Sequence, residues 1–253
     1  KIQVSDGTYV YVTGDAPQGN SPATFALIGS ILVIATGGRM VKLGLTGNTA
    51  YISDTDAPTN VTHVATLDTY LIANKVGTNQ FQFSAPGNVE SWNGLDFASA
   101  ESSPDIIVAL TVYESNLYLL GSETTEVWYN DGVSPFSRIT SLTMENGCSS
   151  ASSVCKTGGS LWWLDTEKRL IRLSSRQPQV VSGAVQNMLT RVVTFGDAKI
   201  TPLIFDNRSI LLITLPTADF TLCYDYVSDK WSQWGEWDIT NQVYKADRIF
   251  SAV

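Results

Sequence analysis

The sequence predicts an all-β protein, and more specifically a β-propeller built from hairpin-based blades. Five apolar, strand-prone runs begin at Leu32, Tyr70, Leu117, Leu161 and Ile210, so that successive starts lie 38, 47, 44 and 49 residues apart. A short turn and a second strand-prone run follow each of them. A hairpin repeated at roughly 40 to 50 residues is typical of propeller blades. The spacing therefore predicts blades of about 45 residues.

The five units share the same order of elements. The first runs cover residues 32–35, 70–73, 117–120, 161–164 and 210–213, and the second runs cover 40–43, 81–83, 125–129, 170–173 and 220–224. Both sets are rich in β-branched, aromatic and aliphatic residues, which favour strands. Gly37-Gly38 and Gly77 supply positive φ at tight turns, and Gly121-Ser122 opens a longer hairpin loop. Five recognisable units follow from this pattern.

Polar segments that contain proline or glycine separate the units. Residues 54–60, 85–94 and 101–105 are of this kind, and we expect loops on the two faces of the propeller there. The most helix-like stretch is 183–192, which has few helix-forming residues and no clear cap. Any helix there is expected to be short.

Partial strands stand at both ends of the sequence. Asp6-Gly7 is a turn signal, and residues 9–13 read as a strand only half a repeat before Leu32. Residues 248–253 read as a further strand. The first residue is Lys1. We expect one β-propeller domain over residues 1–253 that is incomplete at its N-terminus. Whether it is also incomplete at its C-terminus stays open.

The composition is that of a folded, acidic protein. Hydrophobic residues make up 43% and charged residues 16%, which is enough to fill a core. The net charge is −8, from 24 acidic and 16 basic residues. A nucleic-acid clamp needs a basic face, which this balance does not favour. An acidic protein can surround DNA without gripping its phosphates. No apolar run approaches the roughly 18–20 residues that span a bilayer.

Metal and cofactor motifs are missing from the sequence. The three cysteines, Cys148, Cys155 and Cys223, have no metal-ligand spacing and read as free thiols, although a Cys148–Cys155 bridge stays open if the two face each other. Asp54, Asp56 and Asp68 do not follow the spacing of a calcium loop. We expect no cofactor and no metal.

Catalytic patterns are equally weak. Glu123 and Glu126 would be a candidate carboxylate pair, but such pairs need a cleft and one raised pKa, and a structural role is favoured. His63 has no Cys or carboxylate partner in register, so a solvated or hydrogen-bonded histidine is expected. The P-loop, G-x-S-x-G and H-E-x-x-H motifs are absent. The sequence does not predict an enzyme.

Two long blocks carry a more specific pattern. The first is S-W-N-G-L-D-F-A-S-A-E-S-S-P-D at 91–105, and the second runs from L-Y-L-L-G-S-E-T-T-E-V-W-Y-N at 117–130 to L-W-W-L at 161–164. In order and spacing they resemble the packaged-DNA stabilisation proteins of short-tailed bacteriophages, also called head-completion or tail nozzle proteins. The matching signature positions are Trp92, Asp96, Phe97, Pro104, Asp105, Gly121, Thr124, Thr125, Glu126, Val127, Trp128, Tyr129, Gly147, Cys148 and Trp163.

The resemblance covers roughly residues 27–235 and implies a structural virion protein. It implies a six-bladed propeller in a homo-oligomeric ring, a hexamer, below the portal and adaptor proteins of the tail, assembled in the bacterial cytoplasm. Such proteins prolong the DNA channel, retain the packaged genome and anchor a tail needle, spikes or fibres. DNA would pass through without specific binding. The sequence departs from the family between Trp163 and Ser175, where a Gly-rich insertion is missing.

Tryptophan residues leave a second interpretation open. Trp231, Trp234 and Trp237 recur at every third position and form a candidate exposed contact surface, whereas Trp128, Trp162 and Trp163 lie on predicted strands and favour packing. An exposed indole cluster would suit a carbohydrate-binding or glycan-processing propeller, which is the alternative function. WD-repeat propellers are excluded, because the chain has one histidine and one Trp-Asp pair. A generic cellular scaffold propeller is a weaker third option, against which the two blocks argue.

Overall fold

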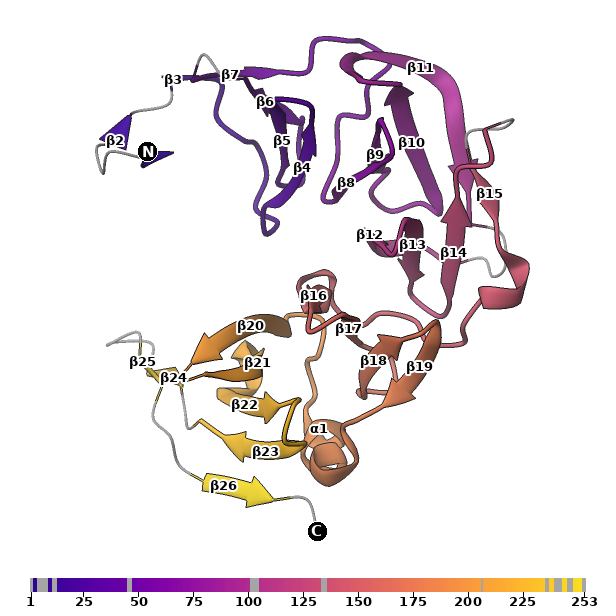
Figure 1. Ribbon diagram of the computed structural model, residues 1–253. Coiled ribbons are helices and arrows are strands. Elements are labelled where there is room, and N and C mark those ends of the chain that lie inside the picture. Colours follow the sequence, from indigo (N-terminus) through magenta and orange to yellow (C-terminus); the bar gives the residue numbers. More distant parts are fainter. Residues whose placement is uncertain are drawn as a thin grey trace. The chain divides into compact units, whose positions relative to one another are not determined.

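The computed structural model consists almost entirely of antiparallel β-sheets (Figure 1). It describes residues 2–3, 9–10, 13–44, 47–100, 105–132, 136–205, 207–234, 237–238, 243–244 and 248–251, with side chains from residue 13 to residue 234. The chain divides into two compact units. Unit 1 comprises Lys1–Gly121 with Glu126–Thr143, and unit 2 comprises Ser122–Thr125 with Met144–Val253.

Unit 1 contains three blades, which we call blades 1 to 3, and each has four consecutive antiparallel strands. Blade 1 is formed by β4 (Thr24–Ile28), β5 (Ile31–Ala35), β6 (Val41–Leu43) and β7 (Asn48–Tyr51). Blade 2 is formed by β8 (Val64–Leu67), β9 (Tyr70–Asn74), β10 (Gln80–Ala85) and β11 (Asn88–Ser99). Blade 3 is formed by β12 (Ile107–Tyr113), β13 (Asn116–Gly121), β14 (Thr125–Tyr129) and β15 (Ser137–Arg138), followed by the 3-10 turn η1 (Thr140–Leu142).

Unit 2 contains blades 4 and 5. Blade 4 follows the 3-10 turn η2 (Ala151–Ser153) and is formed by β16 (Cys155–Thr157), β17 (Ser160–Leu164), β18 (Leu170–Ser174) and β19 (Gln177–Val180). The turn η3 (Gly183–Val185) and the helix α1 (Gln186–Arg191) lead to blade 5. Blade 5 is formed by β20 (Lys199–Phe205), β21 (Arg208–Leu215), β22 (Phe220–Asp225) after the turn η4 (Pro216–Ala218), and β23 (Lys230–Gln233).

Short strands near the ends of the chain complete the sheets. β3 (Thr13–Gly14) pairs in parallel with β7 at the edge of blade 1, and β26 (Arg248–Ser251) pairs antiparallel with β23 at the edge of blade 5. Two separate ribbons are formed by β1 (Ile2–Gln3) with β2 (Tyr9–Val10) and by β24 (Trp237–Asp238) with β25 (Val243–Tyr244). The strand predicted at residues 248–253 is confirmed for 248–251.

All five predicted hairpins are confirmed as the second and third strands of the blades. The first runs lie within β5, β9, β13, β17 and β21, and the second runs overlap β6, β10, β14, β18 and β22. All residues of β13 and of β17 are buried, which explains why these strands read as nearly continuous apolar runs. The short helix predicted in 183–192 is also confirmed, as η3 and α1.

One predicted connector is wrong. Residues 85–94 were expected to form a loop, but β11 begins at Asn88 and continues to Ser99 as the outer strand of blade 2. Its polar residues are tolerated because, in the described part of the chain, no further strand pairs with its outer edge; carboxylates of Asp54 and Asp56 bind backbone N–H groups there instead, and the pairing with β10 is irregular. The turn at Asp6-Gly7 and residues 101–104 of another connector lie outside the described residues.

Apolar clusters join neighbouring blades within each unit. In unit 1, Val33 and Ala35 of blade 1 share a cluster with Leu71 and Ala73 of blade 2. A second cluster joins the other face of blade 2 to blade 3. In unit 2, one cluster joins blade 4, the helix α1 and blade 5, and it includes Trp162. Blade 2, the middle sheet of unit 1, therefore buries both of its faces against its neighbours.

Candidate functional site

The buried carboxylate of Glu126 lies at the centre of a polar network in blade 3. Its Oε2 accepts a hydrogen bond of 2.8 Å from Nε1 of Trp128, and its Oε1 accepts one of 3.1 Å from Nη1 of Arg138. Only 1% of Glu126 is exposed. Between these partners the carboxylate stabilises the sheet and is engaged as a structural ion pair. Sequence reasoning singled out Glu126 but missed Arg138, because the register of β14 and β15 brings the two together.

Gly121 and Asp105 form the second constellation of signature residues. Asp105 is buried beside the end of β13, and a Cβ atom added at Gly121 would overlap with its carboxylate. Only glycine leaves room for this close approach. Val127 is buried on β14, whereas Tyr129 at the end of that strand is exposed. The signature of unit 1 is thus largely a packing signature.

The signature residues of unit 2 form a similar structural network. Thr125 exchanges two backbone hydrogen bonds of 2.9 Å with Met144, and its hydroxyl donates to the carbonyl of Asn146 at 2.6 Å. Nε1 of Trp163 donates to the carbonyl of Gly147 at 3.1 Å. Thr124 is buried next to Thr125. The alternation of polar and apolar residues in this segment therefore serves the sheet and its turn.

Asp165 is a buried carboxylate that sequence reasoning missed. Its Oδ2 binds Nε of Arg169 at 2.7 Å and Nη2 at 2.6 Å, and Nδ2 of Asn146 donates to the same oxygen at 3.2 Å. The spacing Asp-x-x-x-Arg was a signal that could have found it, since it closes the turn between β17 and β18. The ion pair through Oδ2 and the bond from the backbone N–H of Arg169 to Oδ1 together order the turn.

The three cysteines are free thiols, so the Cys148–Cys155 bridge is not formed. Sγ of Cys148 donates to the carbonyl of Ser150 at 3.2 Å. Burial raises the pKa of Cys148 to about 11 and that of Cys155 to about 12. Both thiols remain protonated at neutral pH and are poor nucleophiles.

In blade 2, the signature residues of β11 divide between core and surface. Trp92 is buried, and its backbone N–H donates to Oδ2 of Asp54 at 2.8 Å. The backbone N–H of Asp56 donates to the other oxygen of Asp54 at 2.8 Å. These two bonds hold the pKa of Asp54 below its ordinary value. Asp96 is half-buried and Phe97 is exposed.

The predicted exposed tryptophan surface is wrong for Trp231. This residue is 1% exposed and stacks on Tyr224 with ring centroids 4.4 Å apart, because β23 pairs with β22 and turns Trp231 into the core. Trp234 is half-buried against Phe205. The side chain of Trp237 and the whole of Pro104 lie outside what the structure describes. Trp128, Trp162 and Trp163 are buried, which confirms their packing role.

His63 was expected to be a solvated or hydrogen-bonded histidine. His63 is buried, with its Nδ1 3.0 Å from the hydroxyl of Thr62, so it is a hydrogen-bonded histidine. Asp68 accepts a hydrogen bond from Nδ2 of Asn130. Among the described residues, no group of three or more His, Cys, Asp or Glu side chains could hold a metal ion. In that same part of the chain, no helix has the length and hydrophobicity needed to cross a membrane.

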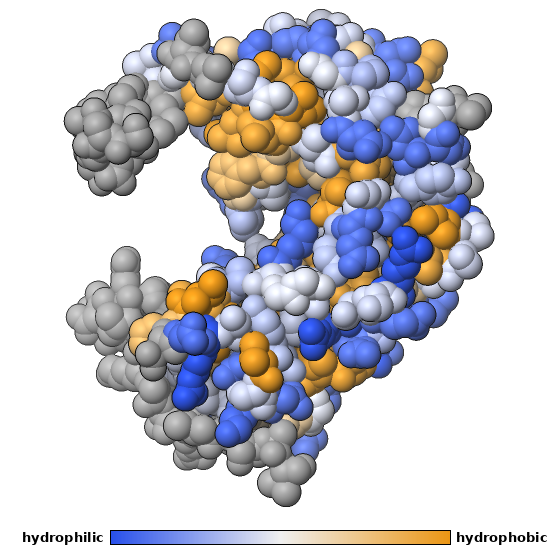
Figure 2. All heavy atoms as spheres, in the orientation of Figure 1, coloured by the Kyte–Doolittle hydropathy of each residue, from blue (hydrophilic) through white to orange (hydrophobic). Residues whose placement is uncertain are grey.

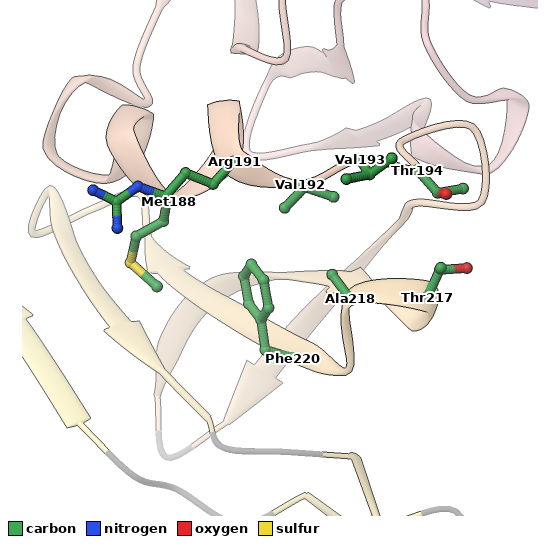
Figure 3. A pocket seen from close by; sticks show the side chains of 8 residues that line it. All are labelled: Met188, Arg191, Val192, Val193, Thr194, Thr217, Ala218 and Phe220. Carbon is green, nitrogen blue, oxygen red and sulfur yellow. The ribbon is translucent and has the colours of Figure 1, made fainter.

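A shallow groove of about 450 Å³ lies in unit 2 (Figure 3). Met188 and Arg191 lie at one end and Thr194 at the other, and Val192 and Phe220 point toward one another between them. A smaller hollow of about 280 Å³ in unit 1 includes Arg39, whose guanidinium donates to the carbonyl of Ile52. Neither arrangement joins a nucleophile to a base. Both are lined mainly by helix, turn and loop residues beside the sheets.

Solved structures resemble the chain at low sequence identity. The Bacteroides fragilis NCTC 9343 protein BF0058 is 10% identical, with a TM-score of 0.51, over 86% of this chain and 71% of that chain. Kluyvelomyces marxianus Hsv2 is 10% identical, with a TM-score of 0.49, over 81% of this chain and 60% of that one. The computationally designed Ika8 protein is 12% identical, with a TM-score of 0.46, over 90% of this chain and 70% of the designed chain. The chain thus spans 60% of the length of Hsv2, and the likeness to BF0058 concerns the fold.

A comparison with curated proteins finds no significant match. The model of a phage stabilisation family, described as "Bacteriophage P22 Gp10, beta-propeller", matches residues 2–253. This match covers all five blades and both signature blocks. The resemblance noted from the sequence is confirmed, and so is the β-propeller fold. The chain therefore belongs to the phage stabilisation family of P22 Gp10, and it is a structural β-propeller protein of a bacteriophage.

Proposed function

We propose that this protein is a tail nozzle or head-completion protein. It forms a homo-oligomeric ring, a hexamer, below the portal and adaptor proteins, extends the DNA channel, retains the packaged genome and anchors a needle, spikes or fibres. The observation that carries the proposal is the family match over residues 2–253. The same match supports a single propeller domain made from both units.

The chemistry of the described residues supports a mechanical role. The signature carboxylates and indoles are engaged in the sheets: Glu126 binds Arg138 and Trp128, and Trp163 binds the carbonyl of Gly147. Such bonds give blades that resist deformation. A tube wall made from rigid blades needs no reacting group, so the proposed function includes no catalysis.

The charge of the protein supports passage of DNA without binding. The net charge is −8, and an acidic surface does not release counterions from phosphates. We therefore expect no retardation of duplex DNA by the purified protein in a gel at low salt. Retardation that disappears when salt is added would show a basic DNA-binding face and contradict this part of the proposal.

The decisive experiment is assembly on the tail. The purified protein is mixed with the portal–adaptor complex of its own phage and viewed by negative-stain microscopy. We expect added ring density on the adaptor side and none when the adaptor is left out. Persistent failure of the protein to form rings with or without the complex would overturn the proposal. The alternative glycan-binding function relied on an exposed cluster of Trp231, Trp234 and Trp237, and the burial of Trp231 argues against that cluster. A glycan array positive for the protein would favour the alternative.

A further inference from the structure

Asparagine followed by glycine occurs at two places in the chain, Asn93-Gly94 on β11 and Asn146-Gly147 shortly before the turn η2. This dipeptide is chemically reactive, because the backbone nitrogen of the glycine can attack the side-chain carbonyl carbon of the asparagine. Glycine has no side chain that hinders the approach, and its backbone adapts easily. The two places are alike in sequence, and the structure gives them different surroundings.

Asn93 lies in the irregular part of β11. The register of β10 with β11 pairs residue 82 with residue 97 and residue 84 with residue 92, so one residue of β10 faces the four residues 93–96. Four residues against one form a bulge outside the regular ladder. Asn93 and Gly94 are exposed, and Figure 2 shows mainly hydrophilic residues over the outer part of blade 2. Water therefore reaches this bulge, and the ladder of β10 does not fix its backbone.

The side chain of Asn93 is folded back over its own backbone. Its Oδ1 accepts a hydrogen bond of 3.0 Å from the backbone N–H of Leu95, two residues further along. This bond closes an Asx turn, which brings Cγ of Asn93 close to the backbone nitrogen of Gly94 between them. The same bond stabilises the negative charge that develops on Oδ1 when Cγ is attacked. Asn93 is thus held near the geometry in which a bond from nitrogen to Cγ forms.

A carboxylate stands at the proton that must leave Gly94. The backbone N–H of Gly94 donates to Oδ2 of Asp56 at 3.2 Å. Asp56 lies in the loop between β7 and β8 and belongs to the same unit as β11. A general base has to lie within about 2.6–3.2 Å of the atom whose proton it takes, and Asp56 meets this requirement. The attacking nitrogen, the attacked carbon and a proton acceptor are therefore together in one place.

We propose that Asn93 is a site of spontaneous deamidation, with Asp56 as the proton acceptor. Oδ2 of Asp56 takes the proton from the Gly94 nitrogen, this nitrogen forms a bond to Cγ of Asn93, and Nδ2 leaves with that proton as ammonia. Water then opens the resulting succinimide at either of its two carbonyl carbons. The products at position 93 are aspartate and isoaspartate, and the second lengthens the main chain of β11 by one carbon. Each adds a negative charge beside Asp56, and the step is independent of the ring proposed above.

Asn146 has the same neighbour but is held by the fold. Its Nδ2 donates to Oδ2 of Asp165 at 3.2 Å, and its backbone carbonyl accepts a hydrogen bond of 2.6 Å from the hydroxyl of Thr125. Gly147 is buried, and a Cβ atom added there would lie 2.5 Å from the backbone of Ser122. Closing a succinimide ring would have to rotate this crowded segment. We therefore expect Asn146 to persist in the folded protein, which makes it an internal control.

The first test follows both asparagines in the purified full chain. The protein is kept in warm neutral buffer, sampled over several weeks, digested and analysed by mass spectrometry, and isoaspartate is detected with isoaspartyl methyltransferase. We expect Asn93 to convert at least about tenfold faster than Asn146. In denaturant the two dipeptides lose their different surroundings, so their rates are expected to become similar. Equal rates in the folded chain, or an Asn93 that persists throughout, would overturn the proposal.

The second test separates the proton acceptor from a merely structural contact. Asp56→Asn keeps the shape of the side chain without the carboxylate and is expected to slow the conversion of Asn93 at least about tenfold. Gly94→Ala is also expected to slow it, and the added Cβ atom fits, since its nearest neighbour is 3.7 Å away. Asp68→Asn, at another exposed carboxylate of unit 1, is the matched control and is expected to leave the rate unchanged.

Equal circular dichroism spectra and unfolding temperatures verify that the three variants fold. A rate that stays the same or rises in Asp56→Asn would show that the hydrogen bond to Asp56 protects Gly94, and it would refute the role assigned to this carboxylate. None of these outcomes touches the assembly of rings on the portal–adaptor complex, so the proposed function is tested separately.

Discussion

The carboxylate of Glu126 and the indole of Trp128 stand two positions apart on β14 and are joined by a hydrogen bond of 2.8 Å. Residues two apart in a strand share a face of the sheet, so this pair projects into the same cluster as Phe81, whose ring lies edge-on to Trp128. The bond satisfies the indole N–H inside an apolar environment, and Arg138 balances the charge.

Glu126→Ala removes the acceptor of both hydrogen bonds. We expect the free energy of unfolding to fall by about 2–4 kcal/mol, since a buried indole N–H loses its partner. Glu126→Gln keeps an acceptor oxygen, so we expect a smaller fall in the free energy of unfolding. Urea unfolding of the two variants and the wild type measures the difference. Equal losses would show that the negative charge, and not the hydrogen bond to Trp128, carries the stabilisation.

Gly121→Ala forces a methyl group into the carboxylate of Asp105. We expect a loss of about 1–3 kcal/mol in the free energy of unfolding, the usual cost of overpacking. Gly44→Ala is the matched control in the same unit, because nothing lies within 4 Å of the added atom. Thermal unfolding measures the stability of both variants. A wild-type stability for Gly121→Ala would mean that Asp105 moves away without cost.

Trp231→Ala empties a core position between blades 4 and 5. The expected loss is about 3–5 kcal/mol, typical of removing a buried tryptophan. Trp234→Ala, at a half-buried position, is expected to cost clearly less. Chemical denaturation followed by tyrosine fluorescence provides the comparison. A larger effect of Trp234 than of Trp231 would contradict the packing described above.

We expect the three thiols of the folded protein to react slowly with Ellman's reagent at pH 8. With pKa values of about 11 for Cys148 and about 12 for Cys155, only a very small fraction of either is thiolate. Burial also raises the pKa of Cys223. In denaturant all three thiols are expected to react at the rate of free cysteine. A fast reaction of one thiol in the native protein would contradict these raised pKa values.

Because of Asp54, we expect the stability of the folded protein to change in mild acid. Backbone hydrogen bonds from Trp92 and Asp56 lower its folded-state pKa, so its contribution is present above the unfolded pKa of about 3.9 and is lost as the pH falls through the folded pKa. The stability difference between wild type and Asp54→Asn should therefore be constant near neutral pH and shrink below about pH 4. Urea midpoints from pH 3 to pH 7 measure it, and a constant difference over the whole range would refute the assignment.

The middle strands of each blade could be predicted from sequence, whereas the outer ones could not. Leu117–Leu120 is buried on both faces and forms an unmistakable apolar run. The outer strand β11 contains Asn93, Gly94 and Asp96, and its exposed edge tolerates polar residues that read as a loop. An outer strand is covered less completely than a middle one, so apolar residues are not required along it and the sequence signal is lost.

For the candidate site, sequence reasoning identified residues but not partners. Glu126 was noticed beside Glu123, while its actual partner Arg138 is 12 residues away on the next strand. Trp231 was placed on the surface by its spacing from Trp234 and Trp237, yet its strand turns it inward onto Tyr224. Residues three apart on a strand lie on opposite faces of the sheet, because side chains alternate with a period of two. The three-residue spacing of the tryptophans therefore did not indicate one shared surface.

The sequence by itself determined the all-β class, the period of the blades, the membership of a phage stabilisation family and the acidic character. These depend on the order of apolar and polar residues along the chain. Only the tertiary structure decided that Gly121 makes room for Asp105, that Asp54 is bound by the backbone of Trp92, and that Trp231 stacks on Tyr224. The physical reason is strand register: a shift of one residue exchanges the two faces of a sheet, and contacts between distant segments follow from that choice.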